Sequence, residues 1–151
     1  MSLKLLRTTS EHPDFVALVA ELDSYLAIVD GEDHEFYHQY NQIDNLYHVV
    51  LAFKDEMPVA CGAIKKLNAI SAEIKRMYVR ETSRQLGIAG EILSELEKWA
   101  EELGFDNCVL ETGKRQIEAI GLYKKYGYQL IENYGQYAKL DTSICYQKAL
   151  K

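Results

Sequence analysis

The spacing of apolar residues changes abruptly near the middle of the chain. From 71 to 79, successive residues alternate between two faces, as in a β-strand. One face of this strand is predicted to carry Ala72, Ile74, Arg76 and Tyr78, and the other Glu73, Lys75, Met77 and Val79. From Ile88 to Leu103 apolar residues recur every three or four positions, which predicts an amphipathic helix. A polar, basic turn that contains Gly87 and Gly90 joins the strand to the helix.

The same two periods predict the other elements. Further strands are expected at 3–8, 46–53, 59–67, 107–112, 128–131 and 143–149, and further helices at 13–29, 34–41 and 116–126. Short turns join the three strands between 46 and 79, which predicts an antiparallel meander. The near-continuous apolar run of 107–112 is typical of a buried central strand. We therefore predict an α/β (α+β) fold, with a mixed, mostly antiparallel sheet of about seven strands and about four flanking helices.

Length and composition favour one globular domain over residues 1–151. Hydrophobic residues make up 48% and charged residues 26%, close to the globular average, so wholesale disorder is not expected. No apolar run approaches the roughly 20 residues that span a bilayer, and no signal peptide opens the sequence, so a cytoplasmic location without membrane contact is expected. The three cysteines lack the spacing of metal ligands, so we expect buried thiols and no metal site.

The net charge of −6 argues against a general nucleic-acid surface. Basic residues are nevertheless dense before the long helix, at Lys75, Arg76, Arg80 and Arg84. A helix start with free backbone N–H groups, glycines and nearby arginines is a suitable anion site. The turn is neither a Walker loop nor a dinucleotide fingerprint. Such a site suits a small polyphosphate, although an ordinary strand-to-helix turn is the alternative.

Two segments carry more specific patterns. Arg84-Gln85-Leu86-Gly87-Ile88-Ala89 follows the strand that ends in Met77-Tyr78-Val79, and Ala119-Ile120-Gly121-Leu122-Tyr123-Lys124-Lys125-Tyr126-Gly127-Tyr128 comes later. In this order, with a strand between them, they resemble the Arg/Gln-x-x-Gly-x-Gly/Ala and Ala-x-x-Leu-Tyr-x-x-x-Gly-Phe/Tyr motifs of the GNAT superfamily. That superfamily consists of N-acetyltransferases that use acetyl-coenzyme A. The run from Glu111 to Gln116 is similar to an uncharacterised bacterial branch of it.

The resemblance implies where the coenzyme lies. The strand ending at Val79 and the strand at 108–112 would be parallel neighbours that splay apart, with a bulge near Tyr78. The pantetheine arm would lie between them, and the pyrophosphate would meet the amides from Gln85 to Gly90. The implied coenzyme-binding residues are Met77, Tyr78, Val79, Arg84, Gln85, Leu86, Gly87, Ile88, Ala89, Gly90, Thr112 and Gln116. Gln116 stands where the family commonly has asparagine.

Acetyl transfer to an amine requires proton transfers at both ends. An alkylamine has a pKa of roughly 10.4, so it must lose a proton before it attacks. The sulfur of the coenzyme, whose thiol has a pKa of about 8.5, leaves more easily when it is protonated as the bond breaks. Glu73 resembles the strand carboxylate that serves as base in part of the superfamily, and Glu111 is a second candidate, acting through water. A salt bridge with Lys75 is the alternative role of Glu73. Tyr123 aligns with the family's general acid.

The acceptor pocket is expected between the N-terminal helices and the late loop. Its candidate residues are Tyr37, Tyr40, Asn41, Tyr134 and Tyr137. The acidic run Asp30–Asp33 favours a cationic acceptor, or is simply a solvated loop. Exposed final strands are consistent with a homodimer.

Three functions are compatible with these patterns to different degrees. The first is an N-acetyltransferase that transfers acetyl from acetyl-coenzyme A to a primary amine, of a small molecule or a protein, by direct attack in a ternary complex. The second is an acyl-coenzyme A sensor or interaction subunit of the same fold without turnover. The third, a nucleic-acid module, is disfavoured by the negative charge.

Overall fold

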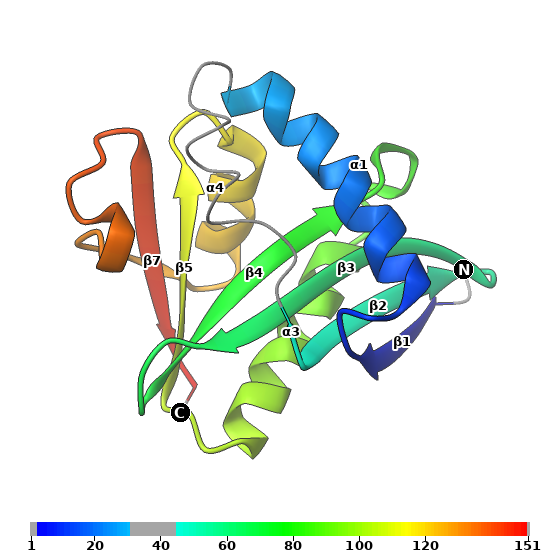
Figure 1. The fold of residues 1–151 in the computed structure, drawn as a ribbon, viewed down its shortest axis with the longest axis horizontal. Coiled ribbons are helices and arrows are strands. Elements are labelled where there is room, and N and C mark those ends of the chain that lie inside the picture. Colours follow the sequence, from blue (N-terminus) through cyan, green and yellow to red (C-terminus); the bar gives the residue numbers. More distant parts are fainter. Residues whose placement is uncertain (1–2, 31–44, 151) are drawn as a thin grey trace.

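The computed structural model describes residues 3–30 and 45–150 (Figure 1). Within these residues one seven-stranded sheet has the order β1-β2-β3-β4-β5-β7-β6. The strands are β1 (Leu3–Thr8), β2 (His48–Lys54), β3 (Met57–Lys66), β4 (Ser71–Val79), β5 (Asn107–Gly113), β6 (Gln129–Ile131) and β7 (Ser143–Ala149). β4 and β5 are parallel, and every other neighbouring pair is antiparallel. The predicted fold class and the meander are confirmed, and β1 is an edge strand.

Helices cover both faces of the sheet (Figure 1). α1 (Pro13–Asp30) packs on one face, and α3 (Ile88–Glu102) and α4 (Ile117–Lys125) pack on the other. Two short 3₁₀ turns, η2 (Glu81–Ser83) and η3 (Gly135–Tyr137), lie in the loops. The helix predicted at 34–41, and with it Tyr37, Tyr40 and Asn41, lies outside the described residues.

Each face has its own hydrophobic core, and the apolar spacing explains both. On the α3 side the buried helix residues are Ile88, Ile92, Leu93, Leu96 and Ala100, which recur at helical spacing. On the α1 side Phe15, Leu18 and Val19 are buried against β2 and β3. The central strands are therefore covered on both faces, as their near-continuous apolar sequences predict.

The hairpin between β2 and β3 is tighter than predicted. Asp55 and Glu56 both have positive φ, at 51° and 73°, as a two-residue hairpin turn requires. β3 therefore begins at Met57, two residues before the predicted start. Pro58 belongs to the strand rather than to the turn.

A bulge interrupts β4 where the sequence analysis assumed regular alternation. The register between β3 and β4 shifts here, so that Arg76 and Met77 together oppose Gly62. Arg76 has φ +57°, which is uncommon for a residue other than glycine. The bulge lies one to two residues before its predicted position near Tyr78.

The predicted faces of β4 are therefore wrong from Arg76 onward. Met77 and Val79 pack in the same core as Ala72 and Ile74, on the α3 side. Tyr78 instead packs in the core under α1, and Arg76 pairs with an acid of that helix. The extra residue of the bulge inverts the alternation, because side chains in a strand repeat with a period of two.

The parallel pair β4 and β5 stays together over a short distance only. Their described residues pair as Ser71↔Asn107, Ala72↔Cys108 and Glu73↔Val109, and no later pair follows. β5 remains paired with β7 up to Gly113. The predicted splay is therefore present, and it opens between the second half of β4 and the second half of β5.

Candidate active site

Two cavities meet at the splay between β4 and β5. The donor cleft, as we name the larger, has a volume of ≈ 450 Å³ and lies against the start of α3 and one side of α4. The acceptor cavity, as we name the smaller, has a volume of ≈ 90 Å³ and lies deeper between the two strands. Both cavities are lined by Leu22, Met77, Gln116, Ala119 and Tyr123. A molecule in one cavity can therefore reach a molecule in the other at these residues.

The start of α3 has the properties of an anion site. Gly87 precedes the helix with φ +79°, and the start has no side-chain cap among the described residues. A Cβ at Gly87 would meet no atom within 4 Å, so the backbone is open at this position. Gln85 also has positive φ, at 64°. The first amides of the helix, which lack intrahelical partners, thus lie at the wall of the donor cleft.

Gly90 is explained by helix packing, and not by contact with a ligand as its position in the sequence motif suggests. A Cβ at Gly90 would collide with the ring of Tyr126, which packs across the start of α3 from the end of α4. Close packing of the two helices, rather than access of a ligand to the backbone, accounts for this glycine. Of these two glycines, only Gly87 has open space in front of it.

Most of the predicted coenzyme-binding residues line the donor cleft. These are Met77, Tyr78, Val79, Arg84, Gln85, Gly87, Ile88, Ala89, Gly90 and Gln116. Thr112 instead lines the acceptor cavity. Leu86 is 45% exposed and lines neither cavity.

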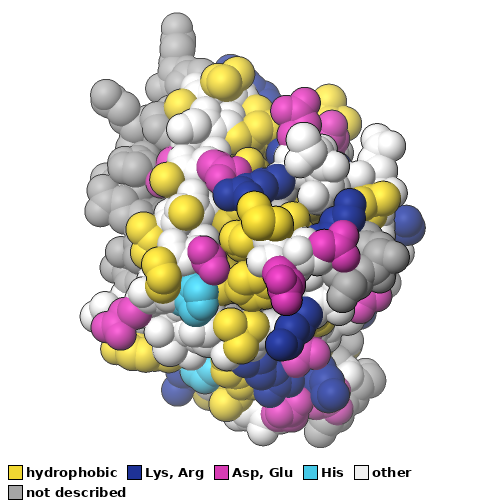
Figure 2. All heavy atoms as spheres, turned by 90° about the vertical axis from the view of Figure 1, so that its right-hand side faces the viewer, with side chains coloured by type: hydrophobic (Ala, Val, Ile, Leu, Met, Phe, Trp, Pro, Cys, Tyr) yellow, Lys and Arg dark blue, Asp and Glu magenta, His cyan; other side chains and the backbone are white. Residues whose placement is uncertain are grey.

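The basic residues before α3 do not form the bare cationic patch that their local density suggests. Each has an acidic partner: Lys75–Glu73 at 3.5 Å, Arg76–Asp23 at 2.7 Å, Arg80–Glu21 at 2.8 Å and Arg84–Glu118 at 3.7 Å. Three of the four acids come from α1 and α4, so the local sequence does not show them. Figure 2 shows one face of the molecule, on which acidic and basic side chains are likewise intermixed.

Arg84 keeps the best access to a ligand among these cations. Its Nε donates to the carbonyl of Val79 at 2.9 Å, which fixes the side chain beside the donor cleft. Its ion pair with Glu118 is long, and Glu118 is 79% exposed, so this pair contributes little. By contrast, Arg80 donates to both carboxylate oxygens of Glu21, and these bonds lower the pKa of Glu21.

Tyr123, the predicted general acid, is buried and lines both cavities. It is 6% exposed on α4 and packs edge-to-face on Tyr128, with 5.7 Å between the ring centroids. Burial, with a smaller contribution from the negative charge of Glu111, raises the pKa of Tyr123 well above its usual value. The phenol therefore stays protonated where the two cavities meet.

Both predicted carboxylates line the acceptor cavity, from opposite strands. Glu73 on β4 is 6% exposed and accepts a hydrogen bond from Tyr134 Oη at 2.6 Å. The predicted alternative, an ion pair of Glu73 with Lys75, is present too. Glu111 on β5 lines the cavity beside Thr112, whose buried Oγ1 has no partner among the described residues.

The late loop supplies two tyrosines with different roles. Tyr137 is 1% exposed and lines the acceptor cavity, as predicted for a pocket residue. Tyr134 packs edge-to-face on Tyr137 and holds Glu73, but does not itself line the cavity. Burial, followed by the charge of Glu73, raises the pKa of Tyr134, which keeps its hydroxyl a donor. No sequence pattern indicates this contact, because the partners are 61 residues apart.

The bond between Tyr134 and Glu73 is expected to stabilise the fold. Tyr134→Phe should lower the free energy of unfolding by about 1.5 kcal/mol, because a partly buried hydrogen bond to a charged group is lost. Urea denaturation measures the change. Tyr47→Phe is the matched control, since Tyr47 is 67% exposed and its replacement should change little. Equal stability of both variants would contradict the assignment.

Among the described residues, no three or more His, Cys, Asp and Glu side chains gather in a way that could hold a metal ion. Within the same residues, no helix combines the length and apolar character that a bilayer crossing demands.

The sequence that builds this fold and its two cavities matches the model of a known protein family. The model of the Acetyltransferase (GNAT) family matches residues 15–128, and the chain belongs to this family. It is 30% identical over 137 residues to an IAA acetyltransferase of Azospirillum brasilense, which covers 89% of this chain and 90% of the relative. It is also 30% identical over 101 residues to the uncharacterized N-acetyltransferase YsnE of Bacillus subtilis, which covers 66% of this chain and 67% of the relative.

Solved structures have the same fold. The crystal structure of a putative acyl-CoA N-acyltransferase from Klebsiella pneumoniae has a TM-score of 0.84 and 25% identity, with 99% of this chain and 98% of that chain covered. The PaiA N-acetyltransferase of Thermoplasma acidophilum, solved in complex with coenzyme A, has a TM-score of 0.69 and 17% identity, with 99% of each chain covered.

Proposed function

We propose that the protein is an N-acetyltransferase that transfers an acetyl group from acetyl-coenzyme A to a primary amine of a small molecule or a protein. One observation carries the proposal. Tyr123, a buried and protonated phenol, lines both the donor cleft at the start of α3 and the acceptor cavity with its two carboxylates. A proton donor and candidate bases therefore lie on the two sides of one reaction centre.

The donor cleft fits a coenzyme with phosphates and a pantetheine arm. Its volume of ≈ 450 Å³ lies in the usual range of ligand sites, about 300–1,000 Å³. The open amides at Gly87 and the guanidinium of Arg84 suit a pyrophosphate. The second half of β4 has no β5 partner, so its backbone can pair with an amide-containing arm as with an added strand.

Acetyl-coenzyme A supplies an activated acetyl group as a thioester. The side chains of the protein manage the protons of the transfer. Glu73 or Glu111, directly or through water, accepts the proton of the amine as its nitrogen bonds to the acetyl carbon and the carbon–sulfur bond breaks. Tyr123 donates its proton to the departing sulfur, so that free thiol is released.

The relatives support this proposal. The Azospirillum relative is named as an acetyltransferase, and the Thermoplasma structure holds coenzyme A. The donor and the direct attack in a ternary complex are proposed for this chain on the geometry above.

The test is an assay of thiol release. The protein is incubated with acetyl-coenzyme A and a panel of small primary amines and peptides, and free coenzyme A is measured with a thiol-reactive chromophore. We expect release that depends on an amine and on the protein. Calorimetric binding of acetyl-coenzyme A with no release across the panel would overturn the enzyme assignment and favour the sensor.

A further inference from the structure

We propose that the acceptor is a small zwitterion of the amino-acid class, which carries a carboxylate a few bonds from the amine that is acetylated. This inference rests on the proposed acetyltransferase function and deepens it. Charges of both signs line the acceptor cavity, and two buried polar atoms there, Arg76 Nε and Thr112 Oγ1, have no partner among the described residues.

The acceptor cavity is lined by charges of both signs. Glu73 and Glu111 contribute negative charge, and Lys75 and Arg76 contribute positive charge. A pocket for a simple amine needs carboxylates, and cations in its wall would repel the ammonium form. A ligand with both charges matches this wall, because each of its ends finds an opposite charge.

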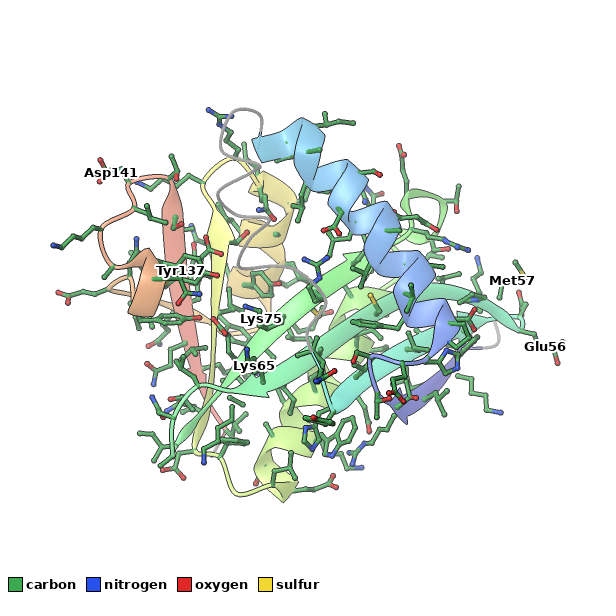
Figure 3. All side chains as sticks on the ribbon, viewed as in Figure 1. Glu56, Met57, Lys65, Lys75, Tyr137 and Asp141 are labelled. Atoms are coloured by element: carbon green, nitrogen blue, oxygen red, sulfur yellow. The ribbon has the colours of Figure 1, made fainter. Side chains whose placement is uncertain are left out.

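Among the described residues, Lys75 has a single, long ion pair, so its ammonium can bind a further anion. Its side chain is 12% exposed, and its Nζ is 3.5 Å from Glu73, which exceeds the about 2.7–2.9 Å of a good charge-assisted hydrogen bond. Glu73 meanwhile accepts the shorter bond from Tyr134, at 2.6 Å. Glu73 is thus held mainly by Tyr134, which leaves the Lys75 ammonium able to donate to a second acceptor. Figure 3 shows Lys75 beside the gap where β4 and β5 diverge.

Arg76 places a second cation in the same wall. Its side chain is 2% exposed, and one end of the guanidinium donates to Asp23 at 2.7 Å. Its Nε has no partner among the described residues, which is costly for a buried donor. The backbone holds Arg76 in the left-handed region, at φ +57°, and such strain is common at ligand sites. The bulge therefore turns this cation toward the α1 side, where Lys75 also lies.

The opposite end of the cavity suits the amine. Glu111 and Thr112 lie on β5, across the splay from Lys75 and Arg76. Thr112 Oγ1 is buried without a partner among the described residues and can accept an N–H. The charge of Glu111 contributes to the raised pKa of Tyr123, consistent with their proximity. The amine would therefore face Glu111 and Tyr123, and the carboxylate would face Lys75 and Arg76. In this orientation Glu111, rather than Glu73, is the carboxylate that accepts the amine proton.

The volume of the cavity favours a small ligand. Its ≈ 90 Å³ exceeds the roughly 10–15 Å³ that one water molecule needs and suits a group of a few heavy atoms. An amine with an adjacent carboxylate is a group of this size.

Matched pairs of amines test the inference. Each standard amino acid is compared with its methyl ester and with the amine that lacks its carboxylate, in the thiol-release assay. We expect kcat/KM to be at least roughly tenfold higher for one or more amino acids than for both matched analogues. Equal or faster turnover of the analogues overturns the zwitterion and leaves the acetyltransferase function intact.

Variants of Lys75 give a second, independent measurement. Lys75→Met should raise the KM for the preferred amino acid at least roughly tenfold and remove the preference for substrates with a carboxylate. Lys75→Arg keeps the positive charge and should keep both the KM and the preference of the original protein. Lys66→Met is the matched control, because Lys66 is exposed on β3 and lines neither cavity. A preference that persists in Lys75→Met contradicts the role of this cation.

The absence of thiol release with every amine would overturn the proposed acetyltransferase function. In that case, a binding experiment with amino acids tests the zwitterion site by itself. Saturation-transfer NMR of amino acids against the complex with coenzyme A is the measurement. Binding that weakens in Lys75→Met supports a zwitterion site, and absence of binding in the original protein overturns it.

Discussion

Tyr123→Phe is expected to lower kcat by about 100-fold, at the lower end of the usual contribution of a positioned general acid. The variant removes one oxygen from a buried ring that lines both cavities, so the donor cleft keeps its shape. The affinity for acetyl-coenzyme A, measured by calorimetry, should therefore stay within about twofold of the original. Steady-state thiol release measures kcat.

Tyr128→Phe is the matched control for this loss. Tyr128 is also buried and contacts the Tyr123 ring, but its hydroxyl donates to Glu97 and lines neither cavity. We expect this variant to retain turnover. Near-normal turnover in Tyr123→Phe would reject the general acid.

The pH profile provides a further check on Tyr123. A group that acts protonated loses its function as the pH rises through its pKa. Because burial raises the pKa of Tyr123 above the ordinary value of about 10, half of the activity should be lost only at a pH above about 10. A fall in kcat near pH 8 that is absent from Tyr123→Phe would contradict the expected protonation state.

Gly87→Glu is expected to weaken acetyl-coenzyme A binding by about 100-fold, equivalent to about 2.7 kcal/mol. A carboxylate at the start of α3 would take the place that the amides offer to a phosphate and would repel its charge. The fold should persist, because a Cβ here meets no atom within 4 Å. Calorimetry measures the affinity, and circular dichroism checks the fold.

Gly87→Ala separates backbone strain from charge. Both variants place a side chain at φ +79°, which costs roughly 1–2 kcal/mol for an L-residue. Only the glutamate adds negative charge, so the alanine variant should lose far less affinity. Unchanged binding in Gly87→Glu would remove the phosphate assignment.

The elements with strong local patterns were predictable from the sequence. α3 is predictable because Ile88, Ile92 and Leu96 recur at helical spacing. The open start of this helix is predictable because Gly87 has no side chain that could cover the backbone amides. β5 was predicted from its apolar run. These features depend on residues close in the sequence, where periodicity and turn chemistry act directly.

The features that were missed depend on contacts between distant residues. A bulge was predicted near Tyr78 and lies one to two residues earlier, at Arg76 and Met77. Its exact position was not predictable because arginine can occupy either face of a strand, and the partner of Arg76, Asp23, is 53 residues away. Glu21 reaches Arg80 over a similar separation, so the basic turn looked unpaired in the sequence. Gly90 looked like a ligand-facing glycine, whereas the ring of Tyr126 explains it.

The short ladder between β4 and β5 affects the sheet as a whole. Three residue pairs join a four-stranded block, β1 to β4, to a three-stranded block of β5, β7 and β6. Among the described residues, no strand pairing joins the two blocks beyond those pairs, toward the ends of β4 and β5. A ligand with amide groups between them would supply the missing cross-links, so occupancy of the cleft and cohesion of the two half-sheets should rise together.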